Sequence, residues 1–272
     1  MSLPIAARLC PRLVVVTSDE THGRRARLAR HMLDLMDLPD VPVVQGVDLG
    51  GHHRFLLDDE LPARNGRSFP EIDELVGMLE DAVAAGPVVW VGQGPMSELA
   101  AALVRAPHLA ESIRVTQMGT WLDHYRNKSR ASHNIDTDQK AANIALRLAH
   151  QPQLVLSDHT NVDEIAIGPD SILYKWLTAP GAPAWAQLVG ANMTAWWAWQ
   201  RKRNAPALTR MHDPLTLSAA LDLSFVTFQP QRIRMIADGR IHRDPHGREV
   251  LVSTGVAYGE FDDWLHEMVC VA

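Results

Sequence analysis

Hydrophobic runs of strand length alternate with segments of helical period along most of this chain. Short apolar runs bounded by turn residues are typical of buried strands, whereas apolar residues three and four apart indicate helices. The predicted strands are LVVVTS (13–18), VPVV (41–44), VVWVG (88–92), IRVTQMG (113–119) and QLVLSD (153–158). The predicted helices lie at 24–36, 72–86, after the Gly94-Pro95 turn with Ser97 as cap, 138–150, within 170–204, from Asp213 onward, and 261–269.

This alternation predicts an α/β fold of three layers, in which a mostly parallel, doubly wound sheet is flanked by helices. Residues 232–253 predict a hairpin-type strand pair, with turn signals at Asp238-Gly239 and at 245–247. A Gly-, His- and Asp-rich loop is expected from Gln45 to about Pro70. We find no repeat, low-complexity tract or linker, so a single domain over residues 1–272 is expected.

Composition narrows the possible partners. A net charge of −6 without a long basic cluster argues against a nucleic-acid partner. No stretch approaches the roughly 18 apolar residues that a membrane span needs, and the N-terminal segment is too short and proline-broken for a secretory signal. The two cysteines, Cys10 and Cys270, lie at opposite ends and predict inert thiols in a reducing, cytoplasmic setting.

Ligands of such sheets bind beyond the carboxyl ends of the strands. One of these ends is TSDETH, where Asp19, Glu20 and His22 are either solvated turn residues or catalysts. Further along, His212 directly precedes Asp213 and Pro214. Asp213 either caps a helix that Pro214 begins, or ligates a hard cation or holds a sugar hydroxyl. His212 is either a loop residue or the acid that protonates a leaving group near neutral pH.

Two other segments also allow a structural and a functional interpretation. In SRASHNIDTDQKAA (129–142), Asn134, Asp136 and Asp138 alternate and would share one face of an extended segment. This segment is either a polar loop with Asp138 capping the next helix, or it presents Asn134 to vicinal hydroxyls. Trp185, Trp196 and Trp199 share one side of a helix, either as core or as a pocket wall that stacks on a flat ring.

Six segments, taken in order from about Leu13 to Leu265, resemble motifs of the inosine–uridine-preferring nucleoside hydrolase family. DVPVVQG is similar to D-V-P-V-x-x-G, VWVGQGPMSELAAAL to V-x-L-G-P-L-T-N-L-A, and IRVTQMGT to a strand ending in M-G-G. ASHNIDTDQKAA resembles A-E-F-N-x-x-x-D-P-E-A-A, LVLSDHT resembles L-D-V-T, and MHDPLTLSAALDLSF resembles H-D-P-L-A-V-A-x-x-x-D-P.

The resemblance implies a nucleoside-hydrolase-like fold and a calcium-dependent glycosidase that cleaves the bond between ribose and base. Calcium would bind the vicinal diol of the sugar and the attacking water, and a homo-oligomer, a dimer or tetramer, is expected. The implied site consists of Gln93 and Asp213 as metal ligands, His212 as acid, Asn134 on the diol, Ser132, His133 and Met118 in the same motifs, and Trp196 and Trp199 beside the base.

The chain also departs from the family pattern. The family begins with a strand and an Asp-rich turn, D-T-D-x-G-x-D-D, which supplies calcium's main carboxylates and the general base, and this chain has no such motif. Calcium takes six to eight oxygens, so one carboxylate and one carbonyl would bind it weakly. We therefore do not expect this chain to bind calcium as tightly as the family does. Asp19, Glu20 and His22 are the nearest substitutes for the base, and Asp158 is another.

Further substitutions lie within the matching motifs. The glutamate and phenylalanine of E-F-N are Ser132 and His133, the last glycine of M-G-G is Thr120, and the asparagine of L-T-N is Glu98. Three hypotheses follow. The chain is a nucleoside N-glycosidase with a rebuilt, calcium-poor site, which we favour; or a non-catalytic nucleoside- or sugar-binding homologue; or a shortened form of a working hydrolase. In the third case a missing central strand would expose sheet edges that something else must cover.

Overall fold

A mixed sheet forms the centre of the protein, whose computed structural model describes residues 1–50, 55–57 and 69–270. Its strand order is β3-β4-β5-β10-β8-β9. The strands are β3 (Val88–Gly92), β4 (Ile113–Met118), β5 (Gln153–Val155), β10 (Arg248–Val256), β8 (Val226–Met235) and β9 (Ile241–Arg243). The first four of these run parallel, whereas β8 is antiparallel to both β10 and β9.

Two short strand pairs lie outside this sheet. Strands β1 (Val15–Val16) and β2 (Val43–Val44) are parallel and are connected by α2 (Arg24–Asp34). Strands β6 (Ala166–Ile167) and β7 (Thr209–Arg210) are antiparallel. Part of the Gly-, His- and Asp-rich loop expected after β2 lies outside the described residues.

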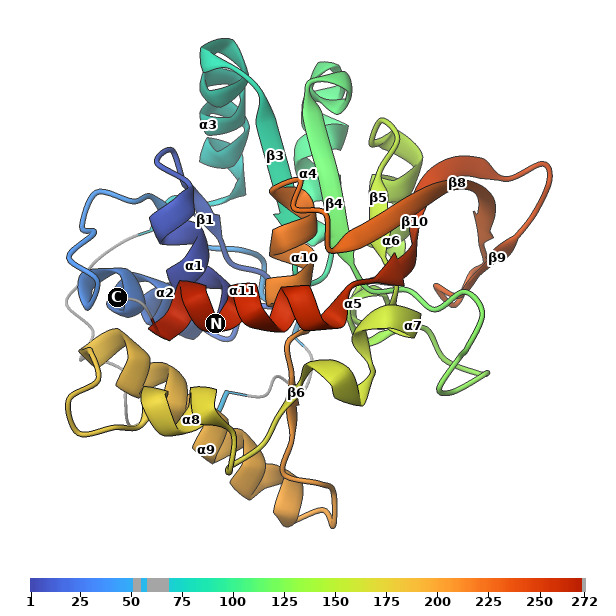
Figure 1. The fold of residues 1–272 in the computed structure, drawn as a ribbon. Coiled ribbons are helices and arrows are strands. Elements are labelled where there is room, and N and C mark those ends of the chain that lie inside the picture. Colours follow the sequence, from blue (N-terminus) through green and yellow to red (C-terminus); the bar gives the residue numbers. More distant parts are fainter. Residues whose placement is uncertain (51–54, 58–68, 271–272) are drawn as a thin grey trace.

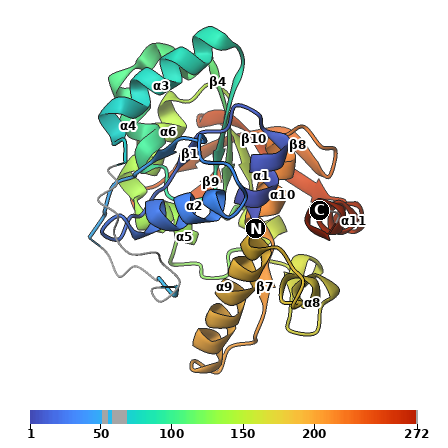
Figure 2. The same cartoon turned by 90° about the vertical axis from the view of Figure 1, so that its left-hand side faces the viewer.

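Helices cover both faces of the central sheet (Figures 1 and 2). One face carries α3 (Ile72–Ala85), α4 (Ser97–Arg105) and α6 (Gln139–Leu148). The other carries α1 (Ser2–Leu9), α10 (His212–Ala220) and α11 (Tyr258–Cys270). Helices α8 (Ile172–Leu177) and α9 (Ala184–Arg201) project beyond one end of the sheet (Figure 2). Further short helical segments of the described chain are α5 (His133–Thr137), α7 (Ser157–Thr160), η2 (Pro107–Glu111) and η3 (Asp163–Ile165).

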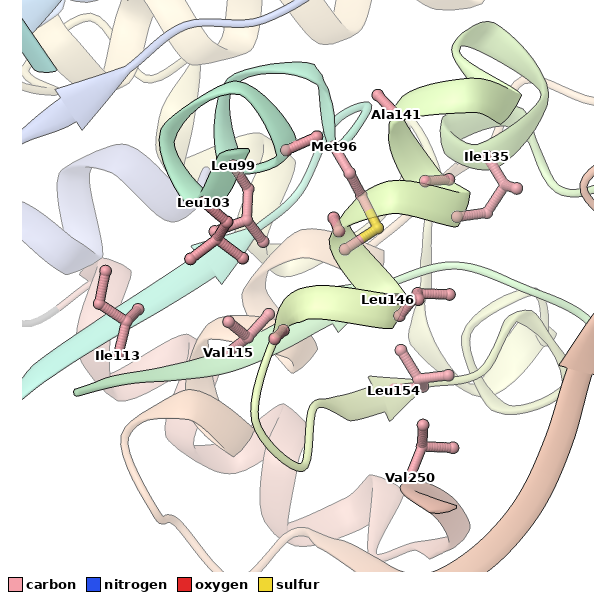
Figure 3. Close-up of a cluster of buried hydrophobic side chains, with 14 of the residues drawn as sticks. Met96, Leu99, Leu103, Ile113, Val115, Ile135, Ala141, Leu146, Leu154 and Val250 are labelled. Atoms are coloured by element: carbon pink, nitrogen blue, oxygen red, sulfur yellow. The ribbon is translucent and has the colours of Figure 1, made fainter. Parts of the chain in front are cut away.

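Each face of the sheet has its own apolar core. Figure 3 shows the core under α4 and α6, where Leu99, Leu103 and Leu146 lie against Val115 and Leu154. The core on the opposite face includes Ile5, Trp197, Leu215, Phe261 and Leu265, all nearly inaccessible to solvent. Apolar side chains on both faces are what the continuous hydrophobic strands predicted. The predicted three-layer α/β architecture is therefore confirmed, with a central sheet that is mixed.

Several local predictions were wrong. Met96 holds the N-cap position of α4, and Ser97 Oγ instead donates to Asp138 Oδ2 at 2.6 Å. Residues 133–137 form a helix, so Asn134, Asp136 and Asp138 do not share the face of an extended segment. Residues 232–253 were predicted as one strand pair but contribute to three strands. Strand β8 pairs with both β9 and β10, and β10 also pairs with β5.

Other local predictions were confirmed. Asp138 caps α6, where its Oδ1 accepts from Ala141 N at 2.9 Å. The turn at Asp238-Gly239 joins β8 to β9, and Gly239 has a φ of +80°, which glycine adopts without strain. None of the helices in the described ranges combines the length and apolarity that a bilayer crossing requires.

Candidate active site

A cavity of about 1170 Å³ opens where β1 and β3 end and α10 begins. This is the edge of the sheet at which α/β proteins bind ligands. Several segments distant in sequence contribute to its walls. They include Thr17–Asp19 after β1, Gln93 after β3, Met193, Trp196 and Gln200 from α9, and His212 and Asp213 from α10.

Glycine allows the ends of β1 and β3 to approach each other. A Cβ atom on Gly94 would lie 2.2 Å from Ser18 Oγ, a distance that real Cβ atoms do not tolerate. A larger residue at position 94 would therefore require the Ser18 hydroxyl to move away, in the segment that also carries Asp19.

Gln93, Asn134 and Asp213 converge at one end of this cavity. Asn134 Nδ2 donates to the backbone oxygen of Gln93 at 3.1 Å and to that of Met118 at 3.3 Å. Gln93 Nε2 in turn donates to the backbone oxygen of Asp213 at 3.0 Å. Gln93 and Asp213 line the cavity, while Asn134 is buried beside them. Three residues predicted from separate motifs therefore form one hydrogen-bonded group.

Ser132 and His133 hold different places around this group. Ser132 is buried, and its hydroxyl accepts from Thr120 N at 2.8 Å. Thr120 has a φ of +68°, a left-handed conformation that is strained for a β-branched residue. His133 lines the cavity. Ser132 and Met118 therefore support the site from behind, and His133 faces it.

His212 is the first residue of α10, and its ring lines the cavity. Desolvation, together with the positive charge of Arg210, lowers the pKa of this imidazole to about 4, although a hydrogen bond to the backbone of Thr160 opposes the shift. Within the described structure Nδ1 is buried without a hydrogen-bond partner. At pH 7 the ring is neutral, so it offers hydrogen-bonding nitrogens but carries no extra proton.

Asp213 lies in the first turn of α10, whose N-cap position belongs to Met211, so the predicted capping role was wrong. Desolvation raises the pKa of its carboxyl to about 6, and the α-ammonium group of Met1 opposes this rise. A carboxyl held in so desolvated a place is suited to accept hydrogen bonds from a ligand.

The donor set does not fit the calcium ion that the family resemblance implies. Calcium takes six to eight oxygen ligands, several of them carboxylates. Across the described residues, we find no group of three or more His, Cys, Asp or Glu side chains able to hold a metal ion. The carbonyl of Gln93 already accepts from Asn134. Of the two implied metal ligands, Gln93 and Asp213, only Asp213 carries a carboxylate, which is too few for a calcium site.

Four residues were candidates for a substitute base, and only Asp19 lines the cavity. Its backbone is left-handed, with a φ of +51°, and Arg25 Nη2 lies 3.2 Å from its Oδ2. Glu20 is fully buried, and its oxygens accept from Thr17 Oγ1 and from three backbone N–H groups near the start of α2. Glu20 is thus a structural residue.

His22 and Asp158 lie elsewhere. The side chain of His22 is 78% exposed, with Nδ1 3.7 Å from Asp48, and it does not line the cavity. The carboxylate of Asp158 accepts from the backbone N–H groups of residues 122, 123 and 124. Neither position supports a catalytic role, and Asp19 is the base candidate that the cavity retains.

The tryptophans of α9 separate into core and cavity residues. Trp196 lines the cavity, and its Nε1 donates to the backbone oxygen of Leu208 at 3.2 Å. Its ring stacks on Trp199 at 4.9 Å between centroids, with 13° between the planes. Trp185 is buried and packs against Trp176, so of the two interpretations of these tryptophans the core interpretation holds at this position.

Several cavity residues were not found from the sequence. They are Arg25, Arg126, Asn161, Gln200, Thr209 and Arg210. Thr209 and Arg210 directly precede the MHDPL segment and Asn161 directly follows LVLSDHT, but the pattern of those motifs does not include them. The tertiary packing brings all six residues to one cavity.

Comparisons with known proteins agree with this arrangement. A family model described as inosine-uridine preferring nucleoside hydrolase matches residues 11–263, which confirms the resemblance of the motifs. A search among curated proteins finds no significant match.

Solved structures resemble the fold along nearly its whole length. A plant nucleoside hydrolase has a TM-score of 0.79 at 19% identity, covering 96% of this chain and 91% of its own. A purine-preferring ribonucleoside hydrolase from Gardnerella vaginalis has a TM-score of 0.75 at 20% identity, and the match covers 100% of this chain and 96% of that one. An inosine-uridine preferring nucleoside hydrolase from Bacillus anthracis has a TM-score of 0.74 at 17% identity, and the match covers 100% of this chain and 95% of that one.

Proposed function

The chain belongs to the inosine-uridine preferring nucleoside hydrolase family, and from this premise we propose that it hydrolyses a nucleoside or nucleoside-like metabolite in a site rebuilt without the usual calcium cluster. The reaction breaks the bond between C1′ of the sugar and a nitrogen of the base. Water supplies the oxygen that joins C1′, and the base leaves with a proton. A cytoplasmic location and a homo-oligomeric state stay predictions.

The observation that carries this proposal is the hydrogen-bonded group of Gln93, Asn134 and Asp213 at the end of a large cavity. These residues come from three separate motifs. A ribose presents two neighbouring hydroxyls, each of which donates and accepts. The amide of Gln93 and the carboxyl of Asp213 are complementary to such a pair, and Asn134 fixes the backbone of Gln93.

Three further residues complete the proposed site. Trp196 offers an indole face held from behind by Trp199, on which a base can stack. His212 hydrogen-bonds the leaving base through its ring nitrogens. Asp19 orients and deprotonates the attacking water. General-base catalysis of this kind typically raises the reaction rate by about 10²–10⁴-fold.

The test is release of free base from purine and pyrimidine nucleosides by the purified protein, measured by chromatography with added calcium and with a chelator. We expect release under both conditions. His212→Ala should abolish it, whereas His266→Ala, on the side of α11 beside Asp262, should not.

Two other outcomes would contradict the proposal, the first its calcium-poor site and the second its enzymatic function. Release that the chelator abolishes would contradict the calcium-poor site. Nucleoside binding without release under any condition would contradict the enzymatic function and support the non-catalytic alternative.

A further inference from the structure

Positive charge gathers in the cavity of a protein whose net charge is −6. Among the described residues that line it, the arginines are Arg25, Arg126 and Arg210, and the carboxylates are Asp19 and Asp213. A neutral nucleoside has no group that requires an excess of guanidinium groups. The charge of the cavity therefore differs from what the proposed reaction alone demands.

The three arginines differ in their partners. Arg25 Nη2 lies 3.2 Å from Asp19, and Arg210 Nη2 lies 2.6 Å from Asp163. Arg126 is exposed on the loop between β4 and α5 and makes no side-chain hydrogen bond or ion pair with the rest of the described chain. Its guanidinium therefore remains available to an anion that enters the cavity.

The segments around Arg126 are tied to the segment that carries Arg210. Asp158 at the start of α7 accepts from the backbone N–H groups of residues 122–124, at 2.6–2.9 Å, just before Arg126. Just beyond the end of α7, the backbone oxygen of Val162 accepts from Arg210 Nε at 3.1 Å. Between them Asn161 lines the cavity. Arg126, Asn161 and Arg210 thus belong to one connected part of its wall.

The size of the cavity leaves room for a ligand larger than a nucleoside. Small-molecule sites typically span about 300–1,000 Å³, and this cavity measures about 1170 Å³. If the vicinal hydroxyls of ribose bind beside Gln93 and Asp213, the remaining hydroxyl at C5′ is the one free to carry a further group. Guanidinium groups match phosphate oxygens in geometry and charge.

We propose that the substrate is a nucleoside 5′-monophosphate, whose phosphate binds Arg126 with Asn161 and Arg210 beside it. This inference rests on the proposed N-glycosidase function and names its substrate class. Water attacks C1′, the C1′–N bond breaks, and the electron pair and a proton leave with the base. The products are the free base and ribose 5-phosphate. The phosphate ester is not cleaved, so water is the only co-reactant.

The decisive experiment compares inosine 5′-monophosphate with inosine, by calorimetric binding and by base release, in the unmodified protein and in Arg126→Gln. We expect the nucleotide to bind about tenfold more tightly than the nucleoside, as a charge-assisted contact allows. Arg126→Gln should remove this preference and leave inosine binding unchanged. Arg232→Gln, which removes an exposed arginine on β8 that does not line the cavity, is the matched control and should keep this preference.

Ionic strength gives an independent measurement. At about 1 M salt the Debye length falls to about 3 Å, so nucleotide binding should weaken towards that of inosine while inosine binding hardly changes. Equal affinities at low salt, or a preference that survives Arg126→Gln, would overturn the inference.

The failure of this inference differs from the failure of the proposed function. Release of base from inosine without a preference for the nucleotide would overturn the substrate class and leave the N-glycosidase function standing. Arg126-dependent binding of the nucleotide with no base release from either compound would support the phosphate site and contradict the glycosidase.

Discussion

Asn134 Nδ2 donates a hydrogen bond to the backbone oxygen of Gln93 at 3.1 Å, across 41 residues of sequence. The same amide also reaches the backbone oxygen of Met118. One side chain on α5 thereby ties together the ends of β3 and β4. This link adds to the β-ladder, which pairs Gly92 with Gln117, and to the hydrogen bond from Gln117 Nε2 to the backbone oxygen of Gly94 at 2.9 Å.

Asn134→Ala should therefore lower both stability and substrate affinity. The change removes the side-chain donor to the backbone oxygen of Gln93, which costs about 1–3 kcal/mol for a buried group, whereas the oxygen of Met118 keeps its hydrogen bond from Gln117 Nε2. Because Gln93 then loses its fixed position, KM for the nucleoside should rise more than kcat falls. Urea denaturation and base-release kinetics measure the two effects.

Asn143→Ala on α6 is the matched control, since within the described residues its side chain hydrogen-bonds only the exposed Arg147, at 3.4 Å. It should change the free energy of unfolding by less than about 0.5 kcal/mol. If Asn134→Ala behaves like this control, the link between the two strands has no energetic importance.

Periodicity predicted the elements that pack on the sheet, because burial fixes their pattern. The strand Val88–Gly92 was predicted with its observed bounds, and the helix Ile72–Ala85 to within one residue. Periodicity failed where polar side chains have alternative partners. Ser97 bonds Asp138 across helices instead of capping its own helix, and the alternating polar residues from Asn134 form a short helix.

The candidate site was predictable only as far as its motifs extend. Gln93 and Asp213 were placed at the ends of elements, and the structure brings them to one cavity. Asp158 shows the limit of this reasoning, because its carboxylate is directed at three backbone N–H groups and not at the cavity. Arg126 and Arg210 lie outside any periodic pattern, so their approach depends on how loops fold over the sheet edge.

Thr120→Gly should stabilise the protein. Thr120 combines a φ of +68° with a buried hydroxyl that has no hydrogen-bond partner within the described structure. A left-handed conformation costs a residue with a Cβ roughly 1–2 kcal/mol, and glycine avoids this cost. We expect the free energy of unfolding to rise by about 1 kcal/mol, measured by urea denaturation.

Thr120→Ala separates the two contributions. It removes the buried hydroxyl but keeps the Cβ atom, and with it the backbone strain. The glycine variant should therefore be more stable than the alanine variant. Equal stabilities would show that the left-handed backbone stores no strain at this position.

Glu98→Gln should stabilise the protein at alkaline pH and not at acidic pH. Glu98 is 1% exposed, and its Oε1 accepts from Val47 N at 2.9 Å. Burial raises the pKa of this carboxyl to about 7, the hydrogen bond from Val47 opposes the rise, and the charges of Asp138 and Glu20 add to it. Glutamine keeps an oxygen acceptor for Val47 and cannot ionise.

The sign follows from proton linkage. Because the pKa of Glu98 is higher in the folded than in the unfolded chain, its contribution to stability is full below about pH 4.5 and is lost as the pH rises through about 7. At pH 8 the folded protein must hold a buried carboxylate near two others. Each pKa unit corresponds to about 1.4 kcal/mol, so Glu98→Gln should gain on the order of 1–3 kcal/mol at pH 8.

Urea denaturation at pH 4.5 and pH 8 tests this dependence, with Glu260→Gln on the exposed side of α11 as control. The control should differ little from the unmodified protein at either pH, because its carboxylate is solvated in both states. The stabilisation by Glu98→Gln should vanish at the lower pH, where Glu98 is protonated in the folded protein. An equal effect at both values would mean that the amide acts through packing or hydrogen bonding and that ionisation of Glu98 does not oppose folding.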